Sequence, residues 1–292
     1  MTTQFGERVA QDFDHAFRGE LVHAEQSRFQ KVDVYDHAHF GRVLTLDDLI
    51  QTTERDEFCY HEMLVHPALC SRDPVERVLI IGGGDGGTLR HVLMHGVSEA
   101  VMCEIDEAVV RVSREFMPSL SGDAFDDPRT KLVIDDGAAL VAQHEDAFDA
   151  IVIDSTDPIG PAVILFSTEF YTACRRALRP DGVIVTQSGS PMYQGAEFAT
   201  AVRNMSGVFD VVESYVGFVP TYPGVLWSFT TGTTGEPVSS TPPDVVRERL
   251  ARRHITTRFY SPEVHRGAFA LPAFVADLAK DAVAATATIP RG

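Results

Sequence analysis

The sequence predicts an α/β protein in which a small N-terminal antiparallel β-domain precedes a doubly wound, mostly parallel sheet. Between residues 28 and 51, the extended runs RFQKVDVY, RVLTL and LIQTT are separated by turn-like HAHFG and DD, as in a small antiparallel sheet. From residue 77 onward, nearly unbroken apolar runs alternate with amphipathic stretches, the pattern of parallel strands covered by helices on both faces. This is a Rossmann-like architecture of the kind found in methyltransferases. We expect residues 1–68 to form the first domain with its linking helix, and residues 69–292 the second.

The elements follow in chain order. A helix is expected from about residue 54 to 66, ending at Pro67 because proline has no N–H to donate. Strands are expected at VLIIG (78–82), AVMCEI (100–105), KLVID (131–135), AIVID (150–154) and VIVTQ (183–187), with helices in TLRHVLMHG, EAVVRVSREFM and STEFYTACRRALRP between them. FDVVESYVGFV and LWSFTTGT, joined through PTYPG, predict a closing antiparallel pair. The tail after about residue 280 is expected to be frayed.

Composition excludes several classes of function. With 25 basic against 42 acidic residues, the formal charge is −17, which repels nucleic acid and anionic membranes and favours cationic ligands. The cysteines (Cys59, Cys70, Cys103 and Cys174) lie far apart, so neither a zinc knuckle nor a disulfide framework is expected, and Cys103 and Cys174 are expected in the core. The start has no signal-peptide pattern and no apolar run approaches the ~20 residues of a membrane span. We therefore expect a soluble, reduced, cytoplasmic protein.

A nucleotide site is predicted where the first parallel strand meets its helix. Gly82, Gly84 and Gly87 satisfy GxGxxG in the required strand-to-helix context, which permits a tight turn and close approach of a ligand to the helix N-terminus. Glu104, 22 residues beyond Gly82, ends the next strand and can accept hydrogen bonds from ribose hydroxyls.

Acids at two further places narrow the identity of the predicted ligand. Asp135-Asp136-Gly137 ends the third strand, where a carboxylate suits an adenine amine, although one of the two acids can instead cap the helix starting at Ala138. Asp85 lies inside the glycine turn, where it disfavours a pyrophosphate. It suits the ammonium of S-adenosylmethionine and opposes that molecule's carboxylate, so the loop favours the decarboxylated form.

Several longer motifs make the sequence similar to a known family. QTTERDEFCYHEMLVHP, LIIGGGDGG, CEID, DDG, DSTDPIGP, PTYPG and RFYSPEVHRGAFALP occur in the order found in spermidine synthases, the polyamine aminopropyltransferases. The resemblance runs from about residue 20 to 280. It implies a β-domain on a Rossmann-like domain, a homodimer or homotetramer, and transfer of the propylamine group of decarboxylated S-adenosylmethionine to putrescine. The products are spermidine and methylthioadenosine, and no prosthetic group or metal takes part.

The resemblance also implies roles for individual residues. Asp154 resembles the catalytic acid that receives the amine proton. The residues similar to those that hold the donor or its methylthioadenosine product are Gln30, His61, Gly82, Gly84, Asp85, Glu104, Asp136, Gly137 and Pro161. The residues similar to the polyamine-binding wall are Tyr60, Ser155, Thr156, Asp157, Gln187 and Tyr222. Val163 departs from the family, which often has glutamate there, so the length of the preferred acceptor stays open.

The proposed chemistry requires acids at this position. Asp154 and Asp157 lie at the C-terminal end of the fourth strand, where open α/β sheets place their ligands. A primary amine is protonated at neutral pH, so it must lose a proton before it attacks the methylene next to the sulfonium. Asp154 would take that proton, and Tyr60 and Asp157 would orient the amine. The group that anchors the far ammonium is not identified.

Three other groups of residues give weaker evidence of function. His61-Glu62 and His66 form HExxxH rather than HExxH, and five residues turn the second histidine roughly 140° or more from the first on a helix, so no zinc site is expected. His66 is expected to be an ordinary histidine at a helix end. Trp227 could line the acceptor channel or pack in a strand, and SGSPMYQ (188–194) is given no role.

Alternative functions remain open from sequence. An S-adenosylmethionine-dependent methyltransferase could share the nucleotide half, although Asp85 and the DSTDP acids argue against it. A non-catalytic relative is disfavoured by the joint presence of Asp154, Tyr60 and Tyr222. Within the aminopropyltransferases, cadaverine, spermidine or agmatine could replace putrescine as the acceptor.

Overall fold

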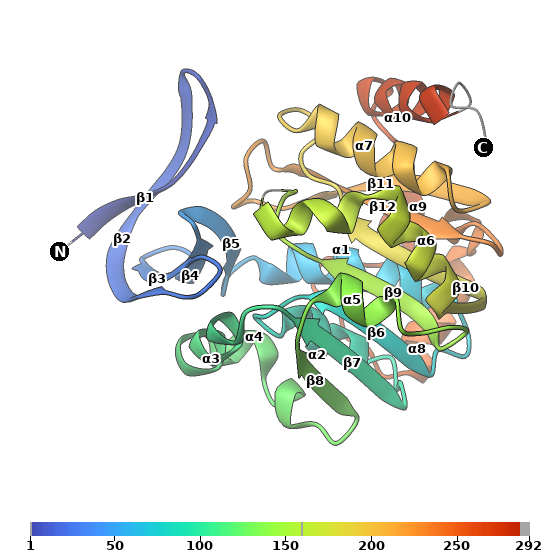
Figure 1. Cartoon of the computed structure of the whole chain (residues 1–292), viewed down its shortest axis with the longest axis horizontal. Helices are drawn as coiled ribbons and strands as arrows, with labels where there is room; N and C mark the ends of the chain where they lie inside the picture. The colour runs from blue at the N-terminus through green and yellow to red at the C-terminus, as the bar shows by residue number, and fades with distance from the viewer. Residues whose placement is uncertain (1, 159, 287–292) are drawn as a thin grey trace.

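The computed structural model describes residues 2–158 and 160–286, which form two β-sheets with helices around the second (Figure 1). The N-terminal sheet is antiparallel in the order β1-β2-β3-β4-β5, built from β1 (Thr2–Ala10), β2 (Phe13–Gln26), β3 (Lys31–His37), β4 (Gly41–Leu46) and β5 (Leu49–Thr53). The expected runs are β3, β4 and β5. The hairpin of β1 and β2 was not predicted, because most of its side chains are exposed and its apolar residues do not alternate clearly.

The second sheet has the order β11-β12-β10-β9-β6-β7-β8. Its strands are β6 (Arg77–Gly82), β7 (Glu99–Glu104), β8 (Thr130–Ile134), β9 (Phe148–Asp154), β10 (Leu178–Gln187), β11 (Val211–Phe218) and β12 (Leu226–Thr233). Strands β6 to β10 pair in parallel, whereas β11 and β12 pair antiparallel and close the sheet beside β10. The predicted strands and the doubly wound fold class are therefore confirmed.

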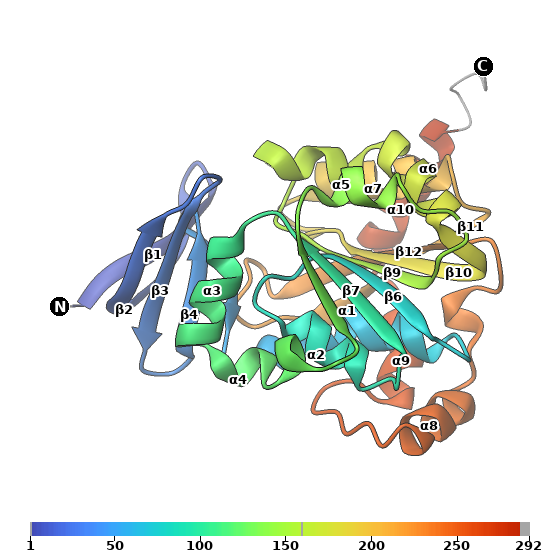
Figure 2. The same cartoon turned by 60° about the horizontal axis from the view of Figure 1, so that its bottom comes forward.

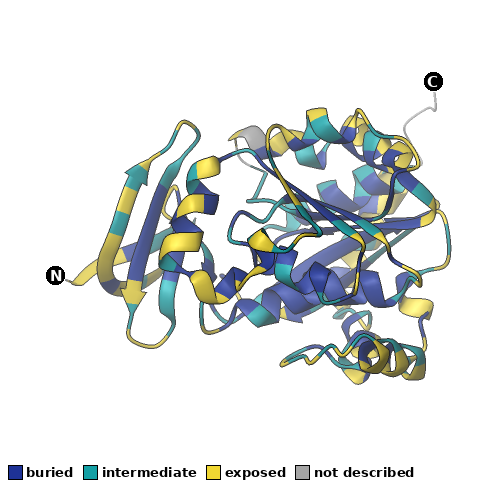
Figure 3. Ribbon diagram, turned by 90° about the horizontal axis from the view of Figure 1, so that it is seen from below, coloured by how far each residue is buried: buried dark blue, intermediate teal, exposed yellow. Residues whose placement is uncertain are grey.

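Helices cover both faces of this sheet (Figure 2). On one face lie α1 (Glu57–Cys70), α2 (Gly87–Leu93), α8 (Pro243–Arg252) and α9 (Pro262–Ala268); on the other lie α5 (Gly137–Val141), α6 (Thr168–Ala177), α7 (Gly195–Ser206) and α10 (Ala273–Thr286). Short 3₁₀ turns occur at Ala124–Asp126, Gly160–Phe166 and Val238–Ser240. Figure 3 shows that α1 and the central parallel strands are deeply buried, whereas β1 and β2 of the N-terminal sheet are largely exposed.

The two halves meet through an apolar contact. Strands β3 and β4 pack on α3 (Glu107–Phe116) and α4 (Pro118–Ser121), with Val32, Leu44, Val112 and Leu120 in the shared cluster. This contact holds the inner end of the N-terminal sheet over the carboxyl ends of the parallel strands, where the site lies. A division after residue 68 stays a prediction.

Helix α1 corrects one expectation. It continues to Cys70 with Pro67 inside it, although proline removes the hydrogen bond to the carbonyl four residues earlier. That carbonyl belongs to Met63, and the Tyr215 hydroxyl donates to it at 2.7 Å. The partner comes from β11, so no local pattern could have shown that the helix continues.

The structure of the C-terminal tail also differs from the prediction. Residues up to Thr286 belong to α10, which packs on α7 through Val275 and Ala282 in a cluster with Phe198 and Val202. Apolar burial therefore orders the stretch after residue 280 that was expected to fray, as far as residue 286. The last part of the expected tail, residues 287–292, lies outside the described residues.

Candidate active site

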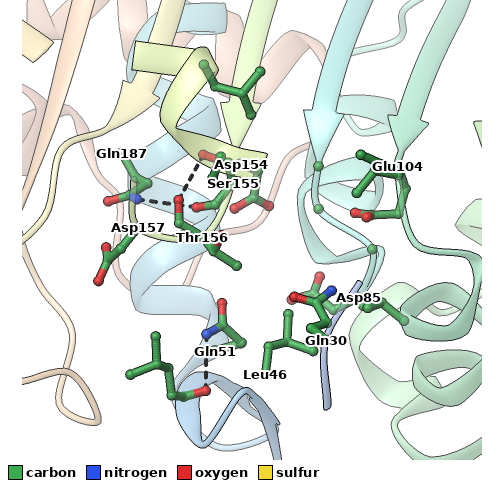
Figure 4. Close-up of a pocket in the computed structure, with 18 of the residues that line it drawn as sticks. Gln30, Leu46, Gln51, Asp85, Glu104, Asp154, Ser155, Thr156, Asp157 and Gln187 are labelled. Atoms are coloured by element: carbon green, nitrogen blue, oxygen red, sulfur yellow. Dashed lines mark hydrogen bonds between the residues drawn. The ribbon is translucent and has the colours of Figure 1, made fainter. Parts of the chain in front are cut away.

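A cavity of about 600 Å³ lies at the carboxyl ends of the parallel strands, under the N-terminal sheet. In Figure 4, Glu104, Asp85 and Gln30 lie on one side, Asp157 and Gln187 on the other, and Asp154, Ser155 and Thr156 between them. We call the first side the donor limb and the second the acceptor limb, after the substrates that the sequence resemblance leads us to expect there. Of the predicted site residues, those lining the cavity are Gln30, Tyr60, Gly82, Gly84, Asp85, Glu104, Asp136, Gly137, Asp154, Ser155, Thr156, Asp157, Gln187 and Tyr222.

Asp154 is the last residue of β9 and lies where the two limbs meet. The Tyr60 hydroxyl donates to its Oδ1 at 2.7 Å, and the Thr88 hydroxyl donates to its Oδ2 at 2.7 Å. Burial and the nearby Asp85 raise the pKa of Asp154, while His61 and the two hydroxyls oppose that rise. Burial also raises the pKa of Tyr60, and Asp154 adds to it, so the phenol keeps its proton and stays a donor. This is a carboxylate held ready to accept a proton.

The glycine turn after β6 is shaped mainly by the protein itself. Gly82 has a φ of +82°, and a Cβ there would lie 2.1 Å from the Asp154 carbonyl oxygen, so glycine is needed where the two strand ends touch. A Cβ on Gly84 would lie 2.7 Å from Val109. A Cβ on Gly87 would lie 2.2 Å from the His61 ring, so this glycine makes room for a side chain rather than for a ligand.

Asp85 faces the cavity, and His61 lies behind it. The Gly87 N–H donates to Asp85 Oδ1 at 2.7 Å, and His61 Nε2 lies 3.5 Å from Asp85 Oδ2. His61 is only 1 % exposed and is not among the residues that line the cavity. Glu57 holds its other nitrogen, Nδ1, at 2.8 Å. His61 therefore acts on the cavity through Asp85.

Glu104 and Gln30 form the far wall of the donor limb. Glu104 Oε1 accepts the Asp106 N–H at 3.0 Å, and burial raises the pKa of Glu104 to about 7. The Gln30 amide donates to Asp106 Oδ2 at 3.1 Å. Asp106 also caps α3 by accepting the Ala108 N–H, so a single carboxylate ties the N-terminal sheet to the α/β half beside this wall.

Asp136 has the capping role that was expected of one of the two acids. Its Oδ1 accepts the N–H groups of Ala138 at 2.8 Å and Ala139 at 3.3 Å, while the residue also lines the cavity. A Cβ on Gly137 would lie 2.4 Å from Ile81, so this glycine lets α5 approach β6.

The acceptor limb contains a buried acid held by amides. Gln194 Nε2 donates to Asp157 Oδ2 at 2.5 Å, and burial raises the pKa of Asp157. Gln187 donates to the Ser155 carbonyl at 3.3 Å and accepts the Gly189 N–H at 2.9 Å. Gln194 belongs to SGSPMYQ, to which sequence reasoning gave no role. Its position after β10, at the ligand-binding edge of the sheet, was the available signal.

Two aromatic residues close this limb: Tyr222 of the β11–β12 connection and Trp227 of β12. The Tyr222 hydroxyl donates to the Gln51 carbonyl at 2.5 Å, and its ring lies 4.5 Å from that of Trp227. Both line the cavity, and Trp227 is also a buried aromatic residue of β12, so it packs in a strand and lines the cavity at once. The loop is fixed by Asp56, whose Oδ2 accepts the N–H and the hydroxyl of Thr221 at 2.9 and 2.7 Å.

Glu7 of β1 also lines the cavity and was missed by sequence reasoning. Burial raises its pKa to about 7, and the charge of Asp157 contributes. The hairpin that carries Glu7 was itself unpredicted, so no signal in the sequence pointed to this residue. Val163, in contrast, is 55 % exposed and is not among the lining residues.

Other expectations have simpler outcomes. His66 is not a helix-end residue: it is 0 % exposed in the interior of α1, because the helix continues past Pro67. The side chain of Pro161 lies outside the described residues. Cys103 and Cys174 are buried, as expected. Across residues 2–158 and 160–286, no group of three or more His, Cys, Asp or Glu could hold a metal ion. No helix in the same part of the chain is long and apolar enough to cross a membrane.

Comparison with known proteins places this geometry in a family. The model of the family described as "Spermine/spermidine synthase domain" matches residues 57–241, and that described as "Spermidine synthase tetramerisation domain" matches residues 19–54. The chain belongs to the spermine/spermidine synthase family. It is 47 % identical over 256 residues to "Polyamine aminopropyltransferase 1" of Pseudomonas aeruginosa, covering 87 % of this chain and 90 % of that one. It is 44 % identical over 275 residues to "Polyamine aminopropyltransferase" of Pseudomonas syringae pv. tomato, covering 94 % and 96 %.

Solved spermidine synthases share the fold. A spermidine synthase in complex with the transition-state analogue AdoDATO superposes with a TM-score of 0.91 at 38 % identity, covering 95 % of each chain. The spermidine synthase of Thermotoga maritima gives a TM-score of 0.88 at 36 % identity, covering 95 % of this chain and 94 % of that one. The resemblance noted in the sequence, the fold class and the assignment to the polyamine aminopropyltransferases are thus confirmed.

Proposed function

We propose that this spermidine synthase relative transfers the aminopropyl group of decarboxylated S-adenosylmethionine to putrescine, with Asp154 as the proton acceptor. One observation carries the proposal: a partly buried carboxylate that accepts two hydrogen bonds stands between two limbs of one cavity, and both limbs contain acids. Both substrates are cations, and the chain has a net charge of −17. A buried site rich in acids is favourable only when cations occupy it.

The reaction needs no covalent enzyme intermediate. The amine nitrogen of the acceptor attacks the methylene carbon next to the sulfonium, the new C–N bond forms as the C–S bond breaks, and the bonding pair leaves with the sulfur of methylthioadenosine. The proton lost by the amine passes to Asp154. Tyr60 and Thr88 hold both oxygens of Asp154 in place, so most of the rate enhancement would come from alignment and proton removal.

The donor limb suits the adenosyl sulfonium. Glu104 would accept hydrogen bonds from the ribose hydroxyls, Asp136 and Gly137 would contact the adenine, and Gln30 would close the limb from the N-terminal sheet. Asp85 would pair with the aminopropyl ammonium, and His61 would act behind it. Gly82 and Gly84 would shape the turn, and Pro161 would contact the methylthioadenosine product. No prosthetic group is needed for this chemistry.

The acceptor limb suits a short diamine. Asp157 and Tyr222 would orient the attacking amine, with Ser155, Thr156 and Gln187 completing the wall. Glu7, which lines the same cavity and interacts electrostatically with Asp157, would anchor the far ammonium, the role that the sequence left unassigned. A homo-oligomer is proposed because residues 19–54 match a family domain described by tetramerisation.

The test compares donors and acceptors directly. Calorimetry with decarboxylated and intact S-adenosylmethionine should show a strong preference for the decarboxylated form. Asp85→Asn should narrow that preference about tenfold, roughly 1.4 kcal/mol, because it removes an attraction for the ammonium and a repulsion of the carboxylate. A wild-type preference for the intact donor would indicate a methyltransferase and contradict the proposal.

An acceptor panel then addresses the second substrate. With decarboxylated donor in excess, putrescine should give the highest kcat/KM among putrescine, cadaverine, agmatine and spermidine, with products separated by chromatography. A higher value for another amine would leave the aminopropyl transfer intact and replace only the acceptor.

A further inference from the structure

Four histidines lie buried behind the donor limb. His61 and His66 belong to α1, His91 belongs to α2, and His95 follows α2. Their exposed fractions are 1 %, 0 %, 2 % and 4 %, respectively, and none of them lines the cavity. Burying four imidazoles is unfavourable unless their nitrogens are hydrogen-bonded. The hydrogen bonds that connect the four rings therefore determine whether they can be buried here.

Three of these rings and one arginine form a continuous chain of contacts. Arg253 Nη1 lies 2.7 Å from His95 Nδ1, His95 Nε2 lies 2.8 Å from His66 Nδ1, and His66 Nε2 lies 3.1 Å from His91 Nδ1. Arg253 is fixed from outside the chain, because it also donates to the carbonyls of Leu69 and Arg72.

Arg253 determines where each proton of the chain lies. A guanidinium can only donate, and a neutral imidazole has one donor and one acceptor nitrogen. His95 must therefore accept at Nδ1 and donate from Nε2, and the same holds for His66 and then for His91. The rings are neutral: burial, with Arg90 and Arg253, lowers the pKa of His66 to about 3 and holds that of His91 and His95 well below its usual range.

The chain ends at a carboxylate beside the active site. His91 Nε2 has no hydrogen-bond partner among the described residues and lies 3.9 Å from Glu57 Oε2. The same Glu57 oxygen is 2.8 Å from His61 Nδ1, and His61 Nε2 is 3.5 Å from Asp85 Oδ2. We infer that Arg253, His95, His66 and His91 form a one-directional hydrogen-bond chain that presents an N–H to Glu57 and keeps this carboxylate ionised. The proton shared by Glu57 and His61 then stays on His61, which lies as an imidazolium against Asp85.

The charged and titratable groups around His61 explain why the protonation of this ring matters for the site. Glu57 and Tyr60 face it from its own helix, Asp85 from the glycine turn, Arg90 and His91 from α2, and Asp154 from β9. Burial alone lowers the pKa of His61, but Asp85 and Glu57 outweigh it and raise the pKa to about 10. The imidazolium offsets the effect of Asp85 on Asp154, because the charge of His61 opposes the rise in the pKa of Asp154. His91, His66, His95 and Arg253 are thus positioning residues.

The inference rests on the proposed donor site for its functional meaning, but its first test needs no substrate. In the ligand-free protein, ¹⁵N NMR of histidine side chains should show His66, His91 and His95 as neutral Nε2–H tautomers that do not titrate between about pH 6 and 9, and His61 with both nitrogens protonated. Single substitutions assign the signals. An Nδ1–H tautomer at His66 or His95, or a neutral His61 at pH 7, would overturn the inference whatever the substrate is.

Variants of the last residue in the chain provide the kinetic test. His91→Leu should raise the donor KM and move the basic limb of kcat/KM down by about one pH unit, since His61 then loses its proton more easily. His91→Gln keeps one acceptor and one donor and should bring the limb back toward the wild-type value. His265→Gln is the matched control, because His265 is equally buried but is bonded to Tyr260 and the Val238 carbonyl; it should leave the limb in place. A wild-type pH profile in folded His91→Leu would show that the ring only fills space.

Discussion

The donor and acceptor limbs of one cavity are assembled in different ways. The donor limb is built largely from loops that follow neighbouring parallel strands: residues 82–85 after β6, Glu104 at the end of β7, and residues 136–137 after β8. The acceptor limb draws Glu7 from β1, Gln51 from β5, Gln194 from the residue before α7, Tyr222 from the β11–β12 connection and Trp227 from β12. The first depends on local motifs, whereas the second depends on the tertiary fold.

The difference predicts how each limb responds to change. Donor-limb residues occupy space that other protein atoms border closely, as at Gly82, Gly84 and Gly137, so substitutions there should affect folding and donor binding together. Acceptor-limb residues are held by single hydrogen bonds between distant segments, as at Asp157 and Tyr222. Substitutions there should change acceptor binding and leave the donor alone.

Asp154 belongs to both limbs and should give the largest effect. Asp154→Asn should reduce kcat by a factor on the order of 10²–10⁴, because the amide cannot take the amine proton, while donor affinity stays nearly unchanged. Stopped-flow release of methylthioadenosine together with donor calorimetry measures both. Near-normal turnover would show that Asp154 is not the proton acceptor, and the reaction could then not be assigned to the junction of the two limbs.

Glu104 tests the donor limb. Glu104→Gln should weaken the donor by about 1–3 kcal/mol, the range for a hydrogen bond to a charged group, with the acceptor KM unchanged. Burial raises the pKa of Glu104 from 4.5 to about 7, so the folded state binds this proton more tightly than the unfolded chain and stability falls as pH rises between these values. At pH 8 the Gln variant should therefore melt at a higher temperature than the wild type. Unchanged donor binding by calorimetry would contradict the ribose assignment.

Glu7 tests the acceptor limb. Glu7→Gln should raise the putrescine KM about tenfold at pH 8, equivalent to roughly 1.4 kcal/mol, without changing donor affinity. Since the pKa of Glu7 is about 7, the wild-type carboxyl becomes neutral below that pH, and its attraction for the ammonium is lost as pH falls. The wild-type KM should thus rise from pH 8 to pH 6, and this part of the rise should be absent in the variant. An equal loss of donor affinity in Glu7→Gln would contradict the assignment of Glu7 to the acceptor limb alone.

Gln194 should give the smallest effect. Gln194→Ala removes the amide that donates to Asp157, and the acceptor KM should rise about threefold to tenfold, which corresponds to the net contribution of about one ordinary hydrogen bond. Gln143→Ala is the control, because Gln143 is an exposed glutamine that only donates to the Ala139 carbonyl. Steady-state kinetics with putrescine decide the matter: equal values for both variants would mean that Gln194 does not support the acceptor limb.

The same difference explains what could be predicted from the sequence. The parallel strands and the donor-limb residues were predicted because apolar runs and loop motifs are local signals. Glu7 was missed because only the tertiary fold brings it to the cavity, whereas Gln194 was missed although its position after β10 was a signal. The helix end at Pro67 was predicted wrongly for a related reason: the hydroxyl that replaces the missing backbone donor belongs to Tyr215, far along the chain.

Helix α1 has a consequence for exchanging parts between relatives. Every residue of α1 except Phe58 is buried, and Tyr60 reaches Asp154 while Glu62 accepts the backbone N–H groups of residues 258–260. A chimera should therefore be joined ahead of this helix, near residue 54, so that α1 stays with the strands on which it is packed. A graft of that length would carry Glu7 and Gln51, together with Gln30 of the donor limb, but leave Asp154, Asp85 and Glu104 in place. Exchanging the first 54 residues while keeping Gln30 should therefore alter the choice of amine without altering the residues that carry the chemistry.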